Sequence, residues 1–155
     1  MTEIINLFDS DKKEYWIDKI GACDWGPGDL LHYMIVKGTF FDFAGEGSEI
    51  LLLTDRDELI SFCTYAKRDD IHTTDLTPWM GFVFTYPEYR GERKMGILFD
   101  EVIRRAKNDG FTEFYISTTH TGLYEKFGCE FLTQMLDFDN EPTRVYVRKI
   151  SQERL

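Results

Sequence analysis

The sequence predicts a mixed α/β fold with a mostly antiparallel sheet, from three observations along the chain. A strand at Trp79–Tyr86 is followed directly by an amphipathic helix and then by another strand at residues 113–118. A strand–helix–strand unit makes a crossover, so its two strands should be parallel neighbours in one sheet. Antiparallel hairpins are predicted on either side of this unit, at residues 50–66 and at residues 130–150.

The first 46 residues predict helices. Ser10-Asp11 is typical of a helix N-cap, and apolar residues then mark a short helix over residues 15–20 and a second one over residues 30–36. Residues 22–46 also gather aromatic side chains together with three acidic ones, Asp24, Asp29 and Asp42. Two interpretations stay open for this stretch: a mobile, aromatic-lined segment that closes over a ligand, or a hydrophobic helical hairpin packed on the sheet.

The two hairpins have similar signatures, which are apolar runs separated by polar turns. The first pairs residues 50–54 with residues 59–66, and the second pairs residues 130–138 with residues 144–150. A short helix over residues 121–127 is expected just before the second hairpin.

The central strand is aromatic and branched. Met80, Phe82 and Phe84 alternate along it, so they should lie on one face. Pro87 lacks a backbone N–H and is expected to end the strand.

The helix after this strand carries apolar residues at three- and four-residue spacing and ends at Gly110. Because it begins straight after a strand and a tight turn, its first N–H groups and its positive dipole end form an anion site. Arg90, Arg93 and Lys94 add positive charge there and favour a phosphate-bearing ligand. The alternative is a solvated helix start with ordinary surface arginines.

The composition indicates one folded domain over residues 1–155. The chain is 43% hydrophobic and 15% aromatic, which is ample for a core. Its formal net charge is −10, from 28 acidic and 18 basic residues. That charge argues against a nucleic-acid binder or a protein that binds anionic membranes. It fits a cationic small-molecule substrate, or it serves solubility alone.

No targeting segment, membrane span or metal site is expected from the sequence. The N-terminal residues are acidic where a signal peptide is basic, and no apolar run approaches the ~20 residues of a membrane helix. Cys23, Cys63 and Cys129 are odd in number and lack metal-ligand spacing. They indicate reduced core thiols in a cytoplasmic protein, although a cysteine nucleophile stays open as an alternative.

Two stretches, taken together, resemble the GCN5-related N-acetyltransferase (GNAT) family. Residues 86–96, Tyr-Pro-Glu-Tyr-Arg-Gly-Glu-Arg-Lys-Met-Gly, resemble its acetyl-CoA pyrophosphate loop. Residues 121–129, Thr-Gly-Leu-Tyr-Glu-Lys-Phe-Gly-Cys, are similar to its Leu-Tyr-Glu-Lys-Leu-Gly-Phe signature. The resemblance implies about six to seven strands flanked by helices. Within that fold, residues 49–150 would form the acetyl-CoA-binding core, and residues 1–46 would form a variable helical segment on the acceptor side.

The sequence departs from the family pattern at three positions. Arg93 and Met95 stand where the pyrophosphate loop usually has small residues, and side chains there can crowd the phosphates. The loop binds through backbone N–H groups, however, so such side chains can point away while the helix is kept. Cys129 replaces the usual aromatic residue after the last glycine, which implies a packing change only.

The resemblance implies roles for particular residues. Tyr124 matches the general acid that protonates the departing thiolate, and the backbone of Phe84 and Thr85 matches the strand end that binds the pantetheine arm. As alternatives, Tyr124 and Phe84 are ordinary core residues. The pyrophosphate would be held by Arg90, Gly91, Glu92, Arg93, Lys94, Met95 and Gly96.

No general base is evident, because the central strand has no carboxylate between Trp79 and Tyr86. His120, Asp75 and His72 are the candidates, and water is a further alternative. Trp79, Asp42 and Asp24 are expected to line an acidic, aromatic pocket for a cationic amine.

The resemblance therefore implies an acetyl-CoA-dependent N-acetyltransferase that acts on a small, cationic primary amine by direct attack, without a metal. The alternative is a non-catalytic acyl-CoA-binding or regulatory domain on the same fold. A nucleotide hydrolase is disfavoured because no Gly-Lys-Ser/Thr follows a glycine-rich loop. The sequence leaves the acceptor unidentified, and a homodimer is an expectation only because dimers are common in the family.

Overall fold

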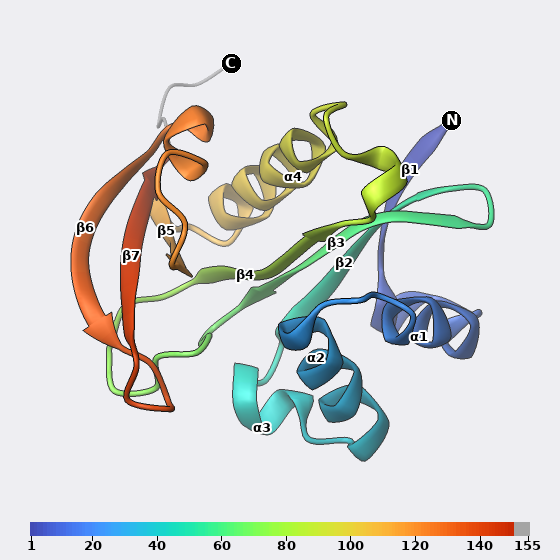
Figure 1. The fold of residues 1–155 in the computed structure, drawn as a ribbon, viewed down its shortest axis with the longest axis horizontal. Coiled ribbons are helices and arrows are strands. Elements are labelled where there is room, and N and C mark those ends of the chain that lie inside the picture. The colour runs from blue at the N-terminus through green and yellow to red at the C-terminus, as the bar shows by residue number, and fades with distance from the viewer. Residues whose placement is uncertain (151–155) are drawn as a thin grey trace.

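The computed structural model describes residues 1–150, which form a seven-stranded sheet flanked by helices (Figure 1). The strand order across the sheet is β1-β2-β3-β4-β5-β7-β6, and every neighbouring pair is antiparallel except β4 and β5. The strands are β1 (Thr2–Asn6), β2 (Glu49–Asp55), β3 (Glu58–Ala66), β4 (Trp79–Thr85), β5 (Glu113–Thr118), β6 (Cys129–Leu136) and β7 (Pro142–Lys149). The helices are α1 (Lys13–Gly21), α2 (Gly26–Lys37), α3 (Phe40–Ala44) and α4 (Lys94–Asn108), with short 3₁₀ turns at Leu7–Asp9, Pro87–Tyr89 and Tyr124–Phe127. The predicted fold class is confirmed, including both hairpins and the crossover between β4 and β5.

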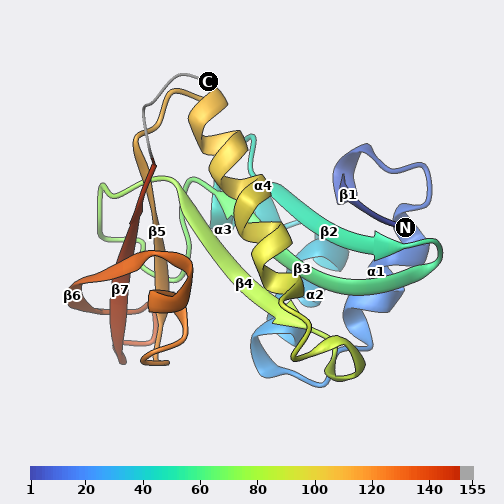
Figure 2. The same ribbon diagram turned by 90° about the horizontal axis from the view of Figure 1, so that it is seen from above.

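The helices cover both faces of the sheet. Figures 1 and 2 show α4 crossing one face, while α1, α2 and α3 lie on the other. The apolar stripe of α4 packs into the larger core cluster through Leu98, Phe99 and Val102, which are fully buried or nearly so. A second cluster joins α1, α2 and α3 to the opposite face of β2 and β3.

The parallel strands β4 and β5 separate almost as soon as they meet. Trp79 and Tyr115 are the one residue pair in register, and the Tyr115 N–H donates to the Pro78 carbonyl oxygen at 3.0 Å. Further along, the two strands splay apart, and each has its other edge paired to an antiparallel neighbour, β3 or β7. The sheet therefore opens along the length of β4, next to the start of α4.

The structure also corrects several local predictions. The strand β1 was missed, because its run of five residues is short and its sheet partner lies about fifty residues away. Residues 22–46 contain α2 and α3, so the helical-hairpin interpretation describes their backbone. The N-cap of α1 is Lys12 rather than Ser10-Asp11, although the Ser10 hydroxyl does accept the Lys12 N–H. The predicted helix at residues 121–127 is reduced to the 3₁₀ turn that ends at Gly128.

The central strand is irregular at Phe82, which the alternation pattern did not predict. Phe82 has a φ of 48°, and the register with β3 shifts at this point, as in a β-bulge. The extra residue of the bulge interrupts the alternation of side chains along β4. Met80 therefore packs in the larger core cluster below α4, while Phe82 and Phe84 pack in the second cluster, on the opposite face. The expectation that Met80, Phe82 and Phe84 share one face is therefore wrong.

Candidate functional site

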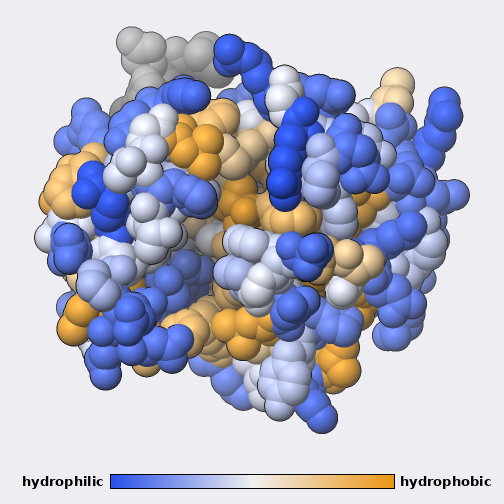
Figure 3. Space-filling view, in the orientation of Figure 1, coloured by the Kyte–Doolittle hydropathy of each residue, from blue (hydrophilic) through white to orange (hydrophobic). Residues whose placement is uncertain are grey.

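A cavity of about 840 Å³ lies where β4 and β5 separate. Its walls come from the start of α2, the loop after β3, the strand β4, the loop before α4, the end of β5 and the turn between β6 and β7. Figure 3 shows a hollow near the middle of this face, with apolar residues at its floor and hydrophilic residues around it. The volume falls in the range of small-molecule and cofactor sites.

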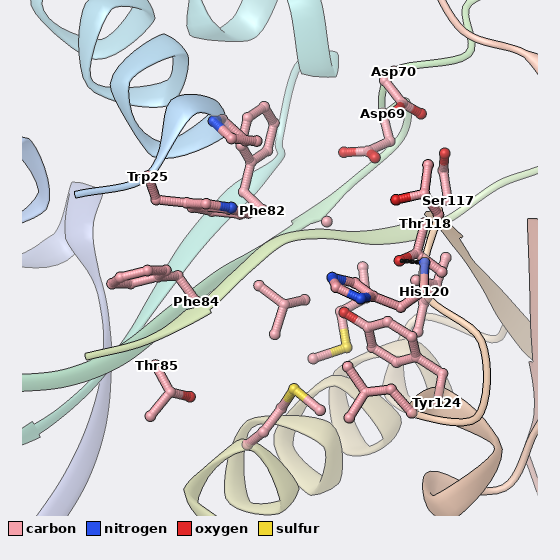
Figure 4. Close-up of a pocket in the computed structure, with 18 of the residues that line it drawn as sticks. Trp25, Asp69, Asp70, Phe82, Phe84, Thr85, Ser117, Thr118, His120 and Tyr124 are labelled. Carbon is pink, nitrogen blue, oxygen red and sulfur yellow. Dashed lines mark hydrogen bonds between the residues drawn. The ribbon is translucent and has the colours of Figure 1, made fainter. Parts of the chain in front are cut away.

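Aromatic side chains form one wall of the cavity. The rings of Trp25 and Phe84 stack with their centroids 5.2 Å apart and their planes 20° apart. Figure 4 shows Trp25, Phe82 and Phe84 together on one side of the open space. Trp25 is the N-cap residue of α2, so the start of that helix borders the cavity.

One end of the cavity is basic. Arg90, Arg93 and Lys94 line it where α4 begins, and no side chain caps the first turn of that helix. Arg90 Nε donates to the Thr85 carbonyl oxygen at 2.8 Å, and its guanidinium lies 5.2 Å from the centroid of the Phe84 ring. Arg93 has a φ of 58°, the left-handed conformation that glycine adopts most readily.

The other residues predicted for the pyrophosphate loop divide into two groups. Gly91 and Met95 line the cavity with the basic residues, and Met95 also packs on the core cluster below α4. Glu92 and Gly96 are not among the lining residues. Gly96 instead faces the 3₁₀ turn, where a Cβ would lie 3.5 Å from Phe127, an ordinary contact.

The backbone of β4 faces the cavity at alternate residues. The Phe84 carbonyl oxygen accepts the Ser61 hydroxyl at 2.7 Å, so it is directed toward β3. Since backbone groups alternate in direction along a strand, those of Val83 and Thr85 face the opposite side, toward the opening. Phe84 therefore borders the cavity with its ring, and Thr85 borders it with its backbone.

Tyr124 lies in the cavity wall. It is buried, and its ring packs against Phe99 and Tyr146 with centroids 6.0 and 6.5 Å away. Burial raises the pKa of its phenol, and the nearby Cys63, Cys129 and Asp69 raise that pKa further when they are charged. The phenol is therefore protonated at neutral pH and available as a proton donor.

The three candidate bases from the sequence are separated by the fold. His120 lines the cavity beside Tyr124, with its backbone N–H held by the Thr118 hydroxyl at 3.1 Å (Figure 4). His72 and Asp75 are exposed and are not among the lining residues.

The expected pocket of Trp79, Asp42 and Asp24 does not form. Trp79 is fully buried, and its indole N–H donates to the Leu76 carbonyl oxygen at 2.7 Å. Asp24 and Asp42 are exposed away from the cavity.

Acidic residues that the sequence analysis missed line the end opposite the basic loop. They are Asp69 and Asp70, which follow β3, and Asp137 and Asp139 in the turn after β6. Asp69 is only 6% exposed, and burial first and Asp70 second raise the pKa of its carboxyl to about 7. Burial also raises the pKa of Asp70, which the neighbouring Ser117 hydroxyl partly offsets. Two adjacent aspartates in the loop after a buried strand were the available signal.

Two further findings concern metals and membranes. Among residues 1–150, no group of three or more His, Cys, Asp or Glu side chains is arranged to hold a metal ion. No helix within the same range is long and apolar enough to cross a membrane.

Comparison with known families gives one match. The family profile described as "Acetyltransferase (GNAT) domain" matches residues 44–132, from the end of α3 into β6. This range contains β4, the basic loop, Asp69 and Tyr124. A sequence search of curated proteins gave no significant match.

Solved structures share the fold at low sequence identity. A GNAT-family acetyltransferase from Desulfovibrio desulfuricans is 12% identical with a TM-score of 0.71, over 97% of this chain and all of that one. A GNAT-family acetyltransferase from Elizabethkingia anophelis, solved with acetyl-CoA bound, is 15% identical with a TM-score of 0.67, over 96% and 98% of the two chains. An aminoglycoside 6′-N-acetyltransferase complexed with coenzyme A is 12% identical with a TM-score of 0.66, over 100% and 99%.

Proposed function

Because the chain belongs to the GNAT family of acetyltransferases, we propose that it is an acetyl-CoA-dependent N-acetyltransferase acting on a small, cationic primary amine. The observation that carries this proposal is the charge pattern of the cavity. Arg90, Arg93 and Lys94 line one end, aspartates line the other, and Tyr124 lies in the wall with them. The same cavity thus offers two binding places, one for a phosphate-bearing donor and one for a positively charged acceptor.

The basic end is suited to the phosphates of acetyl-CoA. Arg93 and Lys94 meet there with the uncapped first turn of α4, and both backbone N–H groups and side-chain charges favour a phosphate at such a helix start. The pantetheine arm would then run along β4, where the backbone of Val83 and Thr85 faces the opening. This arrangement directs the thioester toward Tyr124.

The chemistry needs a free amine, a positioned thioester and a proton for the departing sulfur. The amine nitrogen forms a bond to the thioester carbonyl carbon and gives up one proton to solvent, and the carbon–sulfur bond breaks with its electron pair on sulfur. Tyr124 supplies the proton to that sulfur and is reprotonated from solvent. The raised pKa makes the Tyr124 phenol a weak acid, so the phenol keeps its proton until the thiolate forms beside it.

A cationic acceptor is supported by the acidic end of the cavity and by the aromatic wall beside it. Carboxylates attract an ammonium group, and the faces of Trp25 and Phe82 are also favourable surroundings for a cation. The related enzyme complexed with coenzyme A acts on an aminoglycoside, which is one acceptor to test here. A cytoplasmic location, a single domain over residues 1–155 and a homodimer all remain predictions.

Calorimetry with acetyl-CoA tests the donor half of the proposal. We expect micromolar binding by the wild type and weaker binding by Arg90→Ala, because that variant loses a charge and the contact that ties the loop to Thr85. Asp57→Ala, in the β2–β3 turn, is the matched control and should bind as the wild type does. Turnover is then assayed with spermidine, kanamycin A and an alanyl dipeptide. Binding without turnover of any of these would favour the non-catalytic acyl-CoA-binding domain, and no binding at millimolar acetyl-CoA would overturn the proposal.

A further inference from the structure

Two adjacent carboxylates in the wall of the cavity, those of Asp69 and Asp70, each have one oxygen without a hydrogen-bond partner. Oδ1 of Asp69 and Oδ1 of Asp70 are both buried, and neither has a hydrogen-bond partner within residues 1–150. No ion pair in the same range involves either residue. The adjacent cation does not help, because the Arg68 guanidinium donates to the carbonyl oxygens of Phe43 and Asp42.

Burying a carboxylate oxygen without a partner destabilises the folded protein, so a structural role alone does not explain it. A carboxylate removed from water without a partner costs several kcal/mol, and it usually binds a proton or a cation instead. Asp137, which also lines the cavity, shows the contrast, because its Oδ1 accepts the N–H groups of Asp139 and Glu141 at 2.8 and 3.0 Å. Asp137 therefore shapes the turn, whereas the buried Oδ1 of Asp69 accepts no hydrogen bond within residues 1–150.

The position of Asp69 is fixed by the central strand. Its carboxylate lies against the backbone of Gly81, directly before the bulge at Phe82, and a Cβ on Gly81 would come within 2.0 Å of Oδ1. Figure 4 shows this carboxylate directed into the open space, across from His120 and Tyr124. It is also close enough to Tyr124 for its charge to raise the pKa of that phenol.

We propose that Asp69 binds the ammonium group of the acceptor and takes its proton, with Asp70 as a positioning residue beside it. This inference rests on the proposed function and names the general base that the sequence did not show. The proton passes from the ammonium nitrogen to the Asp69 carboxylate, which leaves the nitrogen lone pair free to attack the thioester carbon. Asp69 then releases that proton to water. After the attack the nitrogen gives its second proton to water as the carbon–sulfur bond breaks, and Tyr124 protonates the sulfur as before.

The electrostatic surroundings suit this role. Burial and the neighbouring Asp70 place the pKa of Asp69 near 7, so the carboxylate and its protonated form are both accessible at neutral pH. The titratable groups that line the cavity with Asp69 are Asp70, His120, Tyr124, Asp137 and Asp139, together with Tyr89, Arg90, Arg93 and Lys94 toward the basic loop. His72 lies outside the lining and acts on Asp70 through its charge. Asp70 acts by repulsion between like charges, so its removal should lower the pKa of Asp69.

Kinetics against pH, with the amine of the spermidine, kanamycin A and dipeptide panel that reacts fastest, tests the assignment. We expect kcat/KM of the wild type to rise through an apparent pKa near 7. Asp69→Asn should lose about 100-fold at pH 7 and recover as the pH approaches the pKa of the amine itself. Asp70→Asn should shift this rise in kcat/KM to lower pH, because removing the neighbouring charge lowers the pKa of Asp69. Asp75→Asn, an exposed aspartate on the same loop, should leave the profile unchanged, and acetyl-CoA binding should be normal in all three variants.

Two readouts separate the ways in which this inference can fail. If the wild type turns over and Asp69→Asn keeps the same dependence of kcat/KM on pH, only the role of Asp69 is overturned. If instead His120→Gln loses the rise of kcat/KM near pH 7, His120 is the base. No turnover by the wild type would overturn the proposed function itself. Independently of activity, the carboxyl ¹³C signal that disappears in Asp69→Asn should titrate near pH 7, and titration below pH 5 would contradict the proposal.

Discussion

The Asp69 carboxylate fills the space above the backbone of Gly81, where a Cβ atom would lie 2.0 Å from Oδ1. Gly81→Ala should therefore force the carboxylate away and destabilise the protein by about 1–3 kcal/mol. In the Asp69→Ala background the same substitution should cost less, with a coupling of about 0.5–3 kcal/mol in denaturant unfolding. Additive effects would mean that the two residues do not compete for this space.

A matched glycine on α4 serves as the control for that experiment. Gly96 lies in the first turn of the helix, and its nearest neighbour to an added Cβ is Phe127 at 3.5 Å, an ordinary contact. Gly96→Ala should be neutral or stabilising by up to about 1 kcal/mol, because alanine favours the helix.

The stability of the protein should depend on the protonation of Asp69. Its pKa is raised from 3.8 to about 7 in the folded state, so between these values the folded protein binds more protons than the unfolded chain. Stability is then greatest at the acidic side of this window and falls as the pH rises from about 4 to about 7, on the order of a few kcal/mol. We expect Asp69→Asn to flatten this part of the unfolding free energy measured against pH, and an identical slope in the variant would contradict the pKa.

The strand–helix–strand unit and both hairpins could be predicted because their signals are local. Periodicity, Pro87 and the glycines that follow each helix are all visible within a few residues. The bulge at Phe82 was not predictable in this way, since it depends on the register with β3 and it reverses the face of every later residue.

The candidate site divides along the same line. Tyr124 and the basic loop belong to contiguous motifs, so the resemblance located them directly. Asp69 becomes significant only once the fold buries it against Gly81 and leaves its Oδ1 without a partner. Before that, Asp69-Asp70 is an ordinary polar pair after a strand, and Trp79 and Asp42 looked equally suitable for an acceptor pocket.

Arg93 has a left-handed backbone at the position where α4 begins, which costs a non-glycine residue about 1–2 kcal/mol. Replacement by Gly, Asn and Ala removes the same charge but relieves this cost to different extents. We expect the Arg93→Gly and Arg93→Asn variants to have higher melting temperatures than Arg93→Ala, because glycine and asparagine tolerate positive φ. Equal stability of the three variants would show that the backbone is free to relax there.

The two adjacent arginines of α4 should differ sharply in their contribution to stability. Both Arg104 and Arg105 pair with Glu101, with Arg105 Nε at 2.7 Å, but only Arg105 also reaches Glu49 on β2. The Arg105 side chain is 23% exposed and the Arg104 side chain 58%. We expect Arg105→Ala to cost about 2 kcal/mol, since Glu49 and Glu101, only 21% and 15% exposed, each lose a charged partner. Arg104→Ala should cost less than about 0.5 kcal/mol. Similar losses in urea unfolding would mean that the link from α4 to β2 is unimportant.

The role of Tyr124 is tested by the loss of a single hydroxyl. Tyr124→Phe keeps the ring that packs against Phe99 and Tyr146, so acetyl-CoA affinity and the melting temperature should change little. The rate of acetyl transfer should fall on the order of 100-fold, because the thiolate must then leave without a positioned proton. Tyr65→Phe, whose hydroxyl donates to Asp109 at 2.8 Å outside the cavity lining, is the control and should keep its rate. A Tyr124→Phe variant with the full rate would mean that this tyrosine serves packing alone and that the sulfur takes its proton from water.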